Sequence, residues 1–327
     1  MIKEVLHIVF IYGVPFAFVM GIFTLWEKGK KFVLKQLAIA IKKDFEIKNR
    51  IDFKKYNWLI RLNPIPSNYS LRAGAYSNVK QSDKAIKDIS KAIDINPYYA
   101  DFYKSRAYYY STIGKNDLAI EDYNKAIDLQ FNLKSYYQLF LFRAQSLKDN
   151  EKYQLAIIDY DIVIKNIPEE IEAYIGKGIC LSRLNEDEKA IDIYKIGLEI
   201  EPNTTELYVN IGISLSNLNK TEESLVYFGK ALEIDNKNDY AYYNRGLSFY
   251  YLKKVNEALQ DLNKALELNP KTDRSYLFLY LGDLYAIVEK DNEKAMNFLQ
   301  KAKELGNKNA QEHIDELNSK GTLVLEW

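Results

Sequence analysis

The sequence predicts an all-α chain, a superhelical solenoid of about seven helix–turn–helix repeats that follows an N-terminal transmembrane helix. Three observations predict it. Five of the seven prolines lie close to multiples of 34 residues apart, three of them close the segments DINP, EIEP and ELNP, and residues 5–26 contain no Asp, Glu, Lys or Arg. A fixed period in this range is typical of stacked helical units, which present surfaces to partners. The five prolines are Pro64, Pro97, Pro168, Pro202 and Pro270.

The first helix of each expected repeat has an aromatic residue, a small residue four positions later, and a large apolar residue three positions after that. The aromatic residues are Tyr69, Tyr103, Phe140, Tyr174, Tyr208, Tyr242 and Phe278. The small residues are Ala73, Ala107, Ala144, Gly178, Gly212, Gly246 and Gly282. Spacings of three and four put all three positions on one face of a helix.

The second helix repeats a small, a large and again a small residue. The first small residues are Ala85, Ala119, Ala156, Ala190, Ser224, Ala258 and Ala295. The large residues are Ile89, Tyr123, Tyr160, Tyr194, Phe228, Leu262 and Leu299. Two helices approach to about 8 Å only where small side chains meet, while bulky neighbours fill the grooves beside the crossing. The proline ends the second helix because the residue before it is disfavoured in helical conformation.

This pattern resembles the tetratricopeptide repeat (TPR) family, whose initial aromatic residue, small–large step, paired alanines and terminal proline recur here in order. The resemblance covers about residues 66–308. The seven expected repeats are 66–99, 100–133, 137–170, 171–204, 205–238, 239–272 and 274–308. Extra residues precede the third repeat, around Leu133–Tyr136, and others are split between the approach to the seventh repeat and its Glu289–Asn292 turn. They are interpreted as loop insertions, and the alternative is that they kink the superhelix.

One departure from the family pattern recurs in five repeats. The leucine that usually precedes the small residue of the first helix is replaced by a basic residue. Such long side chains cover apolar surface with their stems while the charge reaches water. The basic residues are Arg72, Arg106, Arg143, Lys177 and Arg245.

Residues 1–4 form an N-terminal tail, and residues 5–26 are the predicted transmembrane helix. At 1.5 Å per residue this run spans about 33 Å, which is enough to cross the hydrocarbon core. Six lysines follow within residues 28–43 and only Lys3 precedes, so the positive-inside rule puts the repeats in the cytoplasm. The alternative is a cleaved signal peptide ending near Val19–Gly21. The apolar run continues to Trp26, which favours an uncleaved anchor.

Two flanks complete the predicted organisation. Residues 27–65 form a basic juxtamembrane helical segment that ends in YNWLIRLNP, and a degenerate eighth repeat and a plain helix both remain open for it. Residues 309–327 are a polar capping helix and tail, which a solenoid needs to cover its last apolar face. His313 is expected on the surface of this cap. Whether the final TLVLEW folds back onto the cap is left open.

The composition argues against several classes of function. Lys+Arg and Asp+Glu both number 45, which argues against a nucleic-acid binder. The lone Cys180 excludes an internal disulfide framework, and we expect it to be a small buried residue. The two histidines lie at opposite ends of the chain, and no metal-ligand spacing, phosphate-binding glycine loop or nucleophile elbow is present. We therefore expect no catalytic residues, no metal site, no cofactor and no enzyme activity.

The resemblance implies that a ligand lies along the concave surface made by the first helices. A contiguous apolar stripe exposed there is typical of a partner site, and the alternative is that these side chains pack against neighbouring helices. The candidate groove residues are Lys104, Tyr108, Ile175, Ile179, Val209, Ile213, Tyr240, Tyr243, Leu247, Tyr250 and Tyr251. Some family members hold a chaperone C-terminal carboxylate with Lys and Asn. Those places here hold Ser70, Gly74, Leu141, Gln145 and Ile175, so a peptide with apolar anchors fits better.

The function predicted from the sequence is therefore a non-enzymatic, membrane-anchored adaptor or scaffold that binds a protein or peptide in its concave groove. Its repeats lie in the cytoplasm, and the membrane contact is made by residues 5–26. Two alternatives stay open. The chain is an exported, periplasmic or lumenal assembly factor, or it is a regulatory subunit of an enzyme complex.

Overall fold

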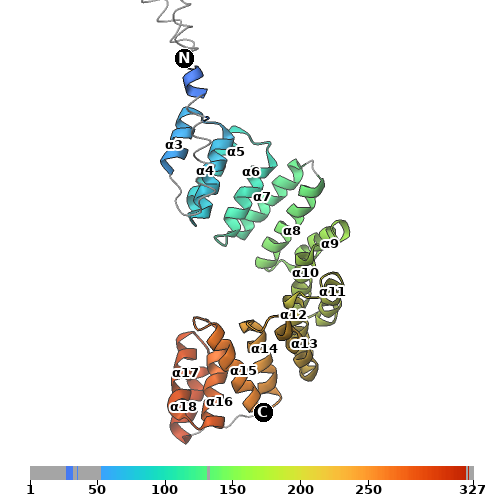
Figure 1. Ribbon diagram of the computed structural model, residues 1–327, viewed down its shortest axis with the longest axis vertical. Helices are drawn as coiled ribbons and strands as arrows, with labels where there is room; N and C mark the ends of the chain where they lie inside the picture. The colour runs from blue at the N-terminus through green and yellow to red at the C-terminus, as the bar shows by residue number, and fades with distance from the viewer. Residues whose placement is uncertain (1–26, 32–34, 36–52, 131–132, 322, 324–327) are drawn as a thin grey trace, which may run out of the picture. The chain divides into compact units, whose positions relative to one another are not determined.

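The computed structural model describes residues 27–31, 35, 53–130, 133–321 and 323, and every regular element among them is a helix (Figure 1). The chain divides into two compact units, Met1–Ser146 and Leu147–Trp327. The helices of unit 1 are α3 (Phe53–Leu62), α4 (Pro66–Asn78), α5 (Ser82–Ile95), α6 (Ala100–Ser111), α7 (Asn116–Leu129) and α8 (Leu133–Asp149), the last of which continues past the unit boundary.

Unit 2 continues the same alternation of helices. Its helices are α9 (Tyr153–Asn166), α10 (Ile171–Arg183), α11 (Asp187–Ile200), α12 (Thr205–Asn217), α13 (Thr221–Ile234), α14 (Asp239–Tyr251), α15 (Val255–Leu268), α16 (Ser275–Leu284), α17 (Asn292–Glu304) and α18 (Ala310–Lys320), with a π-helical turn, η1 (Tyr285–Glu289), after α16. In the described part of the chain, a helix pair lies in each of the seven expected repeats. Neighbouring helices along the chain make most of the helix contacts.

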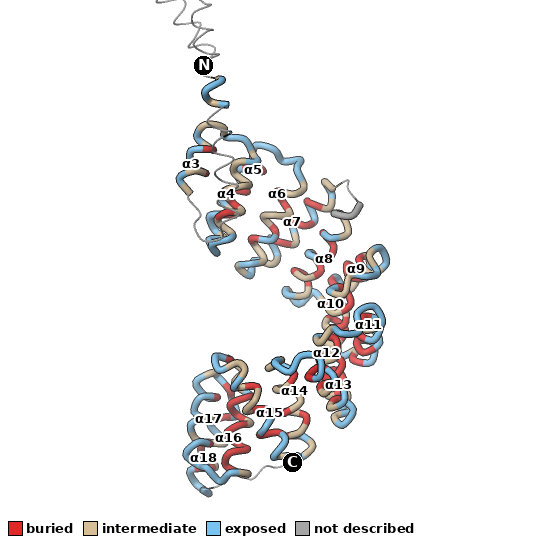
Figure 2. Tube along the Cα trace, viewed as in Figure 1, coloured by how far each residue is buried: buried red, intermediate tan, exposed pale blue. Residues whose placement is uncertain are grey.

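The small and large residues of the repeat meet between helices, as the pattern predicts. Ala73 on α4 and Ala85 on α5 have no exposed surface, and Ile89 is equally buried beside them. In unit 2 the small residue of the first helix is glycine, and a Cβ on Gly212 would lie 2.6 Å from the Phe228 ring. Figure 2 shows buried segments alternating with exposed ones along these helices. Cys180 is buried as expected, and burial raises the pKa of its thiol to about 12.

The first helices end in a way that the sequence analysis did not anticipate. Each is followed by one residue in the left-handed conformation, which is common just past a helix end. Glycine, the residue that adopts this conformation without strain, takes the place only at Gly114 among these described turns. The others are Lys80, Glu151, Asn185, Asn219, Lys253 and Lys290.

Three of the five basic residues of the first helices do not extend into water, and for these three the prediction was wrong. Arg106 on α6 forms two hydrogen bonds to the carboxylate of Asp122 on α7, at 2.7 and 2.8 Å. Arg72 with Asp88 and Arg245 with Asp261 repeat this geometry, always across 16 residues. The aspartates are buried, and the hydrogen bond to each aspartate raises the pKa of its arginine. The pairs therefore clamp the two helices of a repeat together.

The arginines also contact the second helix of the preceding repeat, and this contact bears on the identity of α3. Arg106 donates to the Ser90 hydroxyl on α5 at 3.1 Å, and Arg72 donates to the Asn57 amide oxygen on α3 at 2.6 Å. On α3 itself, Tyr56 and Leu59 are buried against α4. The helix α3 thus packs on α4 as a second helix of a repeat would, which favours the degenerate-repeat interpretation of this segment.

The extra residues of the third repeat and of the turn in the seventh repeat are not loop insertions. Residues 133–136 form the first turn of α8, which is correspondingly long at 17 residues. In the seventh repeat the π-helical turn η1 accommodates the extra residue of the turn. A π-turn inside a helix is a common way to accommodate an extra residue. The extra residues before that repeat do lie in a loop, between the end of α15 at Leu268 and the start of α16 at Ser275.

The capping helix α18 closes the C-terminal end of unit 2. Ala310, Ile314 and Leu317 are buried in one cluster with α16 and α17, and Leu323 of the tail joins the same cluster. His313 was expected on the surface of the cap, and this prediction was wrong. Its side chain contacts α16, where its Nδ1 lies 2.6 Å from Oδ1 of Asp283.

The predicted transmembrane helix at residues 5–26 lies outside the described residues. Among the helices that the structure does describe, none combines the length and the apolar character that a membrane span requires.

Candidate functional site

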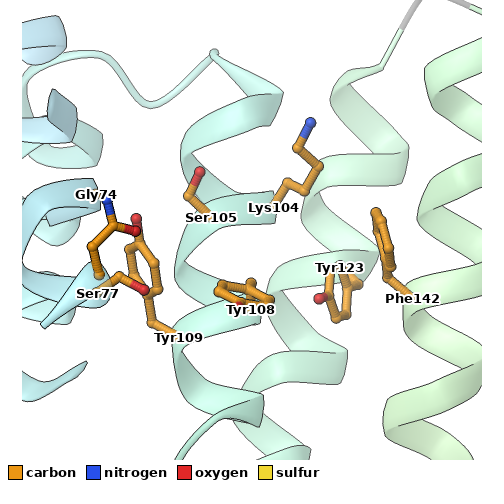
Figure 3. A pocket seen from close by; sticks show the side chains of 9 residues that line it. Gly74, Ser77, Lys104, Ser105, Tyr108, Tyr109, Tyr123 and Phe142 are labelled. Atoms are coloured by element: carbon orange, nitrogen blue, oxygen red, sulfur yellow. The ribbon is translucent and has the colours of Figure 1, made fainter. Parts of the chain in front are cut away.

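Two adjoining cavities open on the first helices of unit 1. One has a volume of about 350 Å³ and lies over α4, α6 and α8, and the other has about 660 Å³ and lies over α4 and α6. Their linings share Gly74 and Tyr109. We call the two cavities together the unit 1 groove. In the pocket of Figure 3, Ser77 and Tyr109 lie on one side, Tyr123 and Phe142 on the other, and Tyr108 between them.

The floor of the groove is a glycine that the fold does not require. A Cβ on Gly74 would meet nothing within 4 Å, although the residue lies inside α4. Glycine in a helix interior costs about 1 kcal/mol relative to alanine. The glycines in the small position of the first helices of unit 2 differ, because a Cβ on Gly246 would lie 2.8 Å from Leu262 and one on Gly282 would lie 2.7 Å from Leu299. Close packing requires glycine at those positions. Gly74 has no such packing contact and instead leaves open space in front of α4.

Aromatic side chains form much of the remaining surface of the groove. Tyr108 is 55% exposed and Phe142 is 36% exposed. Phe142 stacks on Tyr123 with ring centroids 6.2 Å apart, and Tyr108 meets Tyr109 edge to face at 5.8 Å. Burial raises the pKa of Tyr109, and it raises the pKa of Tyr123 to about 12. Both phenols therefore stay protonated at neutral pH.

The charge in the groove is neutralised within the chain. Lys104 is the single charged side chain that lines either cavity, and its Nζ lies 2.6 Å from Oδ1 of Asp101, one turn earlier on α6. Among the described residues that line the two cavities, none is Asp or Glu. The groove therefore offers hydroxyls, amides and aromatic faces rather than net charge.

The structure separates the sequence-predicted groove residues into four groups. Lys104 and Tyr108 line the unit 1 groove. In unit 2, Tyr240 and Tyr251 are exposed. A third group is half-buried, and Ile175, Ile213, Tyr243 and Leu247 of this group pack against core clusters. Ile179 is also half-buried.

Two of the predicted groove residues are core residues instead. Val209 is 2% exposed and packs with Phe228 and Ala241, and Tyr250 is 7% exposed in the cluster of the last two repeats. Their positions in the helix turn them toward the neighbouring helices, which was the alternative explanation of the apolar stripe. We therefore remove both from the candidate groove.

Exposed tyrosines gather on α14 and α16 of unit 2. The hydroxyls of Tyr251 and Tyr280 lie 2.7 Å apart, and the Tyr276 and Tyr280 rings stack at 6.2 Å. Arg274 lies over the Tyr240 ring at 5.1 Å and forms a 2.7 Å ion pair with Asp239. The sequence analysis identified part of this patch and missed Arg274, Tyr276 and Tyr280.

A buried polar cluster connects this region to the capping helix. The carboxylate of Asp283 has no exposed surface, accepts a hydrogen bond from Tyr250 at 3.2 Å, and contacts His313 at 2.6 Å. Burial raises the pKa of Asp283, and the hydrogen bond to Asp283 raises the pKa of His313. The sequence spacing of 30 residues between the two gave no signal for this pair, because the contact depends on how the capping helix α18 packs with α16.

The described residues contain no group of three or more His, Cys, Asp or Glu side chains arranged to hold a metal ion. The groove holds no pair of a nucleophile with a histidine, and its polar groups are suited to binding by hydrogen bonds and ring contacts.

Comparisons with known proteins agree with this architecture. A tetratricopeptide repeat family model matches residues 66–99, 100–133 and 205–238, and a second such model matches residues 240–272. The first three ranges coincide with repeats expected from the sequence. Among curated proteins, no sequence match was found.

Solved structures share the fold at low sequence identity. A tetratricopeptide repeat protein from Parabacteroides merdae has 18% identity and a TM-score of 0.63, with 76% of this chain and 97% of that chain covered. A chain of the APC/C hetero-tetramer Cut9–Hcn1 has 15% identity and a TM-score of 0.60, with 80% of this chain and 51% of that chain covered. The C-terminal part of a TPR repeat-containing protein from Cytophaga hutchinsonii has 17% identity and a TM-score of 0.54, with 74% and 97% covered. The chain therefore carries tetratricopeptide repeats, and the part that the structure describes is an all-α TPR solenoid.

Proposed function

We propose that this chain is a non-enzymatic scaffold that binds a protein or peptide partner in the unit 1 groove. The observation that carries the proposal is Gly74, the shared floor of two cavities. This glycine weakens α4, serves no packing contact, and keeps the groove open. Close approach of a ligand to the helix backbone is a recognised reason for glycine at such a place.

The composition of the groove supports a partner rather than a small metabolite. Exposed aromatic side chains surrounded by polar groups are typical of protein interfaces, where tyrosine carries much of the binding energy. The two cavities together run along α4 and α6, so the groove suits an extended segment. One solved structure of the same fold belongs to a protein assembly, Cut9–Hcn1.

Partner capture with a blocking variant tests this proposal. In Gly74→Leu the new side chain would project into the groove, and no atom within 4 Å of its Cβ opposes it. Gly229→Leu on α13 is the matched control, because a Cβ at Gly229 also meets nothing within 4 Å and the residue lies outside the groove. We expect quantitative proximity labelling to lose its specific partners in Gly74→Leu and to retain them in Gly229→Leu. Equal partner recovery from both variants would contradict the proposal.

We further propose that residues 5–26 anchor the chain in a membrane with the repeats on the cytoplasmic side. The support is the uncharged run, the lysines that follow it, and the positive-inside rule. Protease treatment of sealed membranes tests the orientation. Repeats that are digested from the cytoplasmic side fit the proposal, whereas repeats that are digested only from the opposite side favour an exported assembly factor. Release of the repeats without detergent would favour a cleaved signal peptide.

A further inference from the structure

The aromatic lining of the unit 1 groove and its lack of carboxylates among the described residues favour one chemical class of ligand, and this inference rests on the function proposed above. We propose that the groove takes a proline-rich segment without net charge, bound in the extended polyproline II conformation.

The first argument is the supply of hydrogen-bond donors. Both cavities are lined by hydroxyl and amide groups and by no carboxylate among the described residues. A proline-rich segment has carbonyl acceptors that no internal hydrogen bond satisfies, and its prolines have no N–H to donate. Ser70, Ser77, Asn78 and Tyr109 of the lining can donate to such carbonyls.

The second argument is the aromatic surface. Tyr99, Tyr108 and Phe142 line the groove, and each is at least 36% exposed. Polyproline II segments dock on aromatic-lined grooves, where the flat prolyl ring lies against an aromatic face. Such a segment is already extended before it binds, so little conformational entropy is lost when it does. The Tyr109 phenol lines both cavities and stays protonated at neutral pH, so it can donate a hydrogen bond to a ligand carbonyl.

The third argument is charge. The Lys104 ammonium has Asp101 at 2.6 Å, which offsets part of the charge that the groove presents to an acidic ligand. No carboxylate lines the cavities to attract a basic ligand. A neutral segment therefore complements this surface better than a charged one.

The fourth argument is the floor of the groove. With no side chain at Gly74, a ligand ring can reach the backbone of α4 between Ser70 and Ser77, one helical turn to either side. A leucine at this position would occupy that space. Gly74 therefore determines where the ligand lies, and its replacement by leucine should prevent the ligand from binding.

Three fluorescent ten-residue probes test the inference on the full-length protein in detergent: an oligoproline, a neutral peptide without proline, and a glutamate-rich peptide. We expect fluorescence anisotropy to show oligoproline binding more tightly than the other two by about tenfold or more. Gly74→Leu should weaken oligoproline binding by at least about tenfold, and Gly229→Leu should leave it unchanged. Tyr108→Ala, at a side chain that is 55% exposed, should weaken it severalfold and covers the case in which Gly74→Leu does not fold.

The outcomes separate this inference from the proposed function. No oligoproline binding, equal binding of the proline-free probe, or preference for the glutamate-rich probe would each overturn the inference. If Gly74→Leu loses its cellular partners while oligoproline does not bind, the groove is a partner site for another ligand class. If oligoproline binds only with Gly74 intact but partner capture is insensitive to Gly74→Leu, the proposed function fails and the ligand chemistry stands.

Discussion

The two units carry different residues at the same place in their first helices, directly after the small packing residue. In unit 1 these include Gly74 and Tyr108, and the surface beside them is hollowed into a groove. In unit 2 they include Ile213 and Leu247, which pack against the core, and Asp283, which is fully buried. An apolar residue at a groove position therefore becomes part of the helix packing. The unit 1 groove lies where such a residue is missing.

If the two units differ mainly at these positions, removing an arginine–aspartate pair should lower the free energy of unfolding by the same amount in both units. Arg106→Ala in unit 1 leaves Asp122 buried without its arginine, and Arg245→Ala in unit 2 does the same to Asp261. We expect each to lower the free energy of unfolding by about 3 kcal/mol, measured by urea denaturation. Lys91→Ala removes only an exposed pair with Asp94 and should change stability by less than about 1 kcal/mol. A large difference between the two arginine variants would show that the pairs are not equivalent.

Glycine-to-alanine substitutions should give the next largest change in stability, and the change should have opposite signs in the two units. Gly178→Ala places a methyl group against the Tyr194 ring and should destabilise the protein by about 1–3 kcal/mol. Gly74→Ala meets nothing and should stabilise it by up to about 1 kcal/mol, because alanine favours the helix. Thermal melts of the two variants check this. A destabilised Gly74→Ala would mean that the glycine has a structural role after all.

The pH dependence of stability should be concentrated at the C-terminal end of unit 2. The hydrogen bond to Asp283 raises the pKa of His313 above 6.5, so the stability it contributes is present below that pH and is lost as pH rises through the raised value. Burial raises the pKa of Asp283 as well, so its ionisation also lowers stability with rising pH. Glu312 and Glu316 on α18 and Tyr250 on α14 complete the titratable groups acting on the pair.

We therefore expect hydrogen exchange in α18 to speed up, beyond the intrinsic base-catalysed rise, as the pH rises above 6.5 through the raised pKa of His313. His313→Gln should remove that excess and leave exchange in α4 unaffected. An excess of equal size in the variant would rule out His313 as its source.

The smallest predicted effect concerns the turns that end the first helices. Asn185 in unit 2 has a φ of 60°, whereas unit 1 uses Gly114 at the equivalent place of its second repeat. Asn185→Gly should change stability by less than about 1 kcal/mol, and Gly114→Ala should cost about 1 kcal/mol because its φ of 71° strains a side chain. Comparison of the two melting temperatures tests whether both turns are held in the same conformation.

Much of the helical scaffold could be predicted from the sequence, because short residue patterns that recur from repeat to repeat determine it. The small–large alternation placed Ala73, Ala85 and Ile89 in the core, where the structure has them. The arginine clamps were missed, although an aspartate stands 16 residues after Arg72, Arg106 and Arg245, which is a readable signal. The repeats with Lys177 or Ile211 in that position carry Ile193 or Tyr227 16 residues later.

The candidate site was much less predictable. Lys104 and Tyr108 were identified, but the stripe pattern cannot distinguish an exposed residue from one such as Val209 that a neighbouring helix covers. The sequence analysis noted Gly74 only as a place where a carboxylate-binding Lys or Asn is missing. Its proposed role depends on the empty space around it, which the structure shows. The Asp283–His313 contact could not be predicted from the sequence, because it depends on how α18 packs with α16. The membrane anchor at residues 5–26 remains a prediction.

Site-specific photo-crosslinking compares the two units most directly. Tyr108 in unit 1 and Tyr251 in unit 2 are matched, since both are tyrosines of first helices with 55% and 59% exposure. Benzoylphenylalanine would replace each in turn in cells, with and without Gly74→Leu. We predict a specific crosslinked partner from position 108 that disappears with Gly74→Leu. Crosslinks to the partner from position 251 alone, or crosslinks from position 108 that persist with Gly74→Leu, would contradict a partner site in the unit 1 groove.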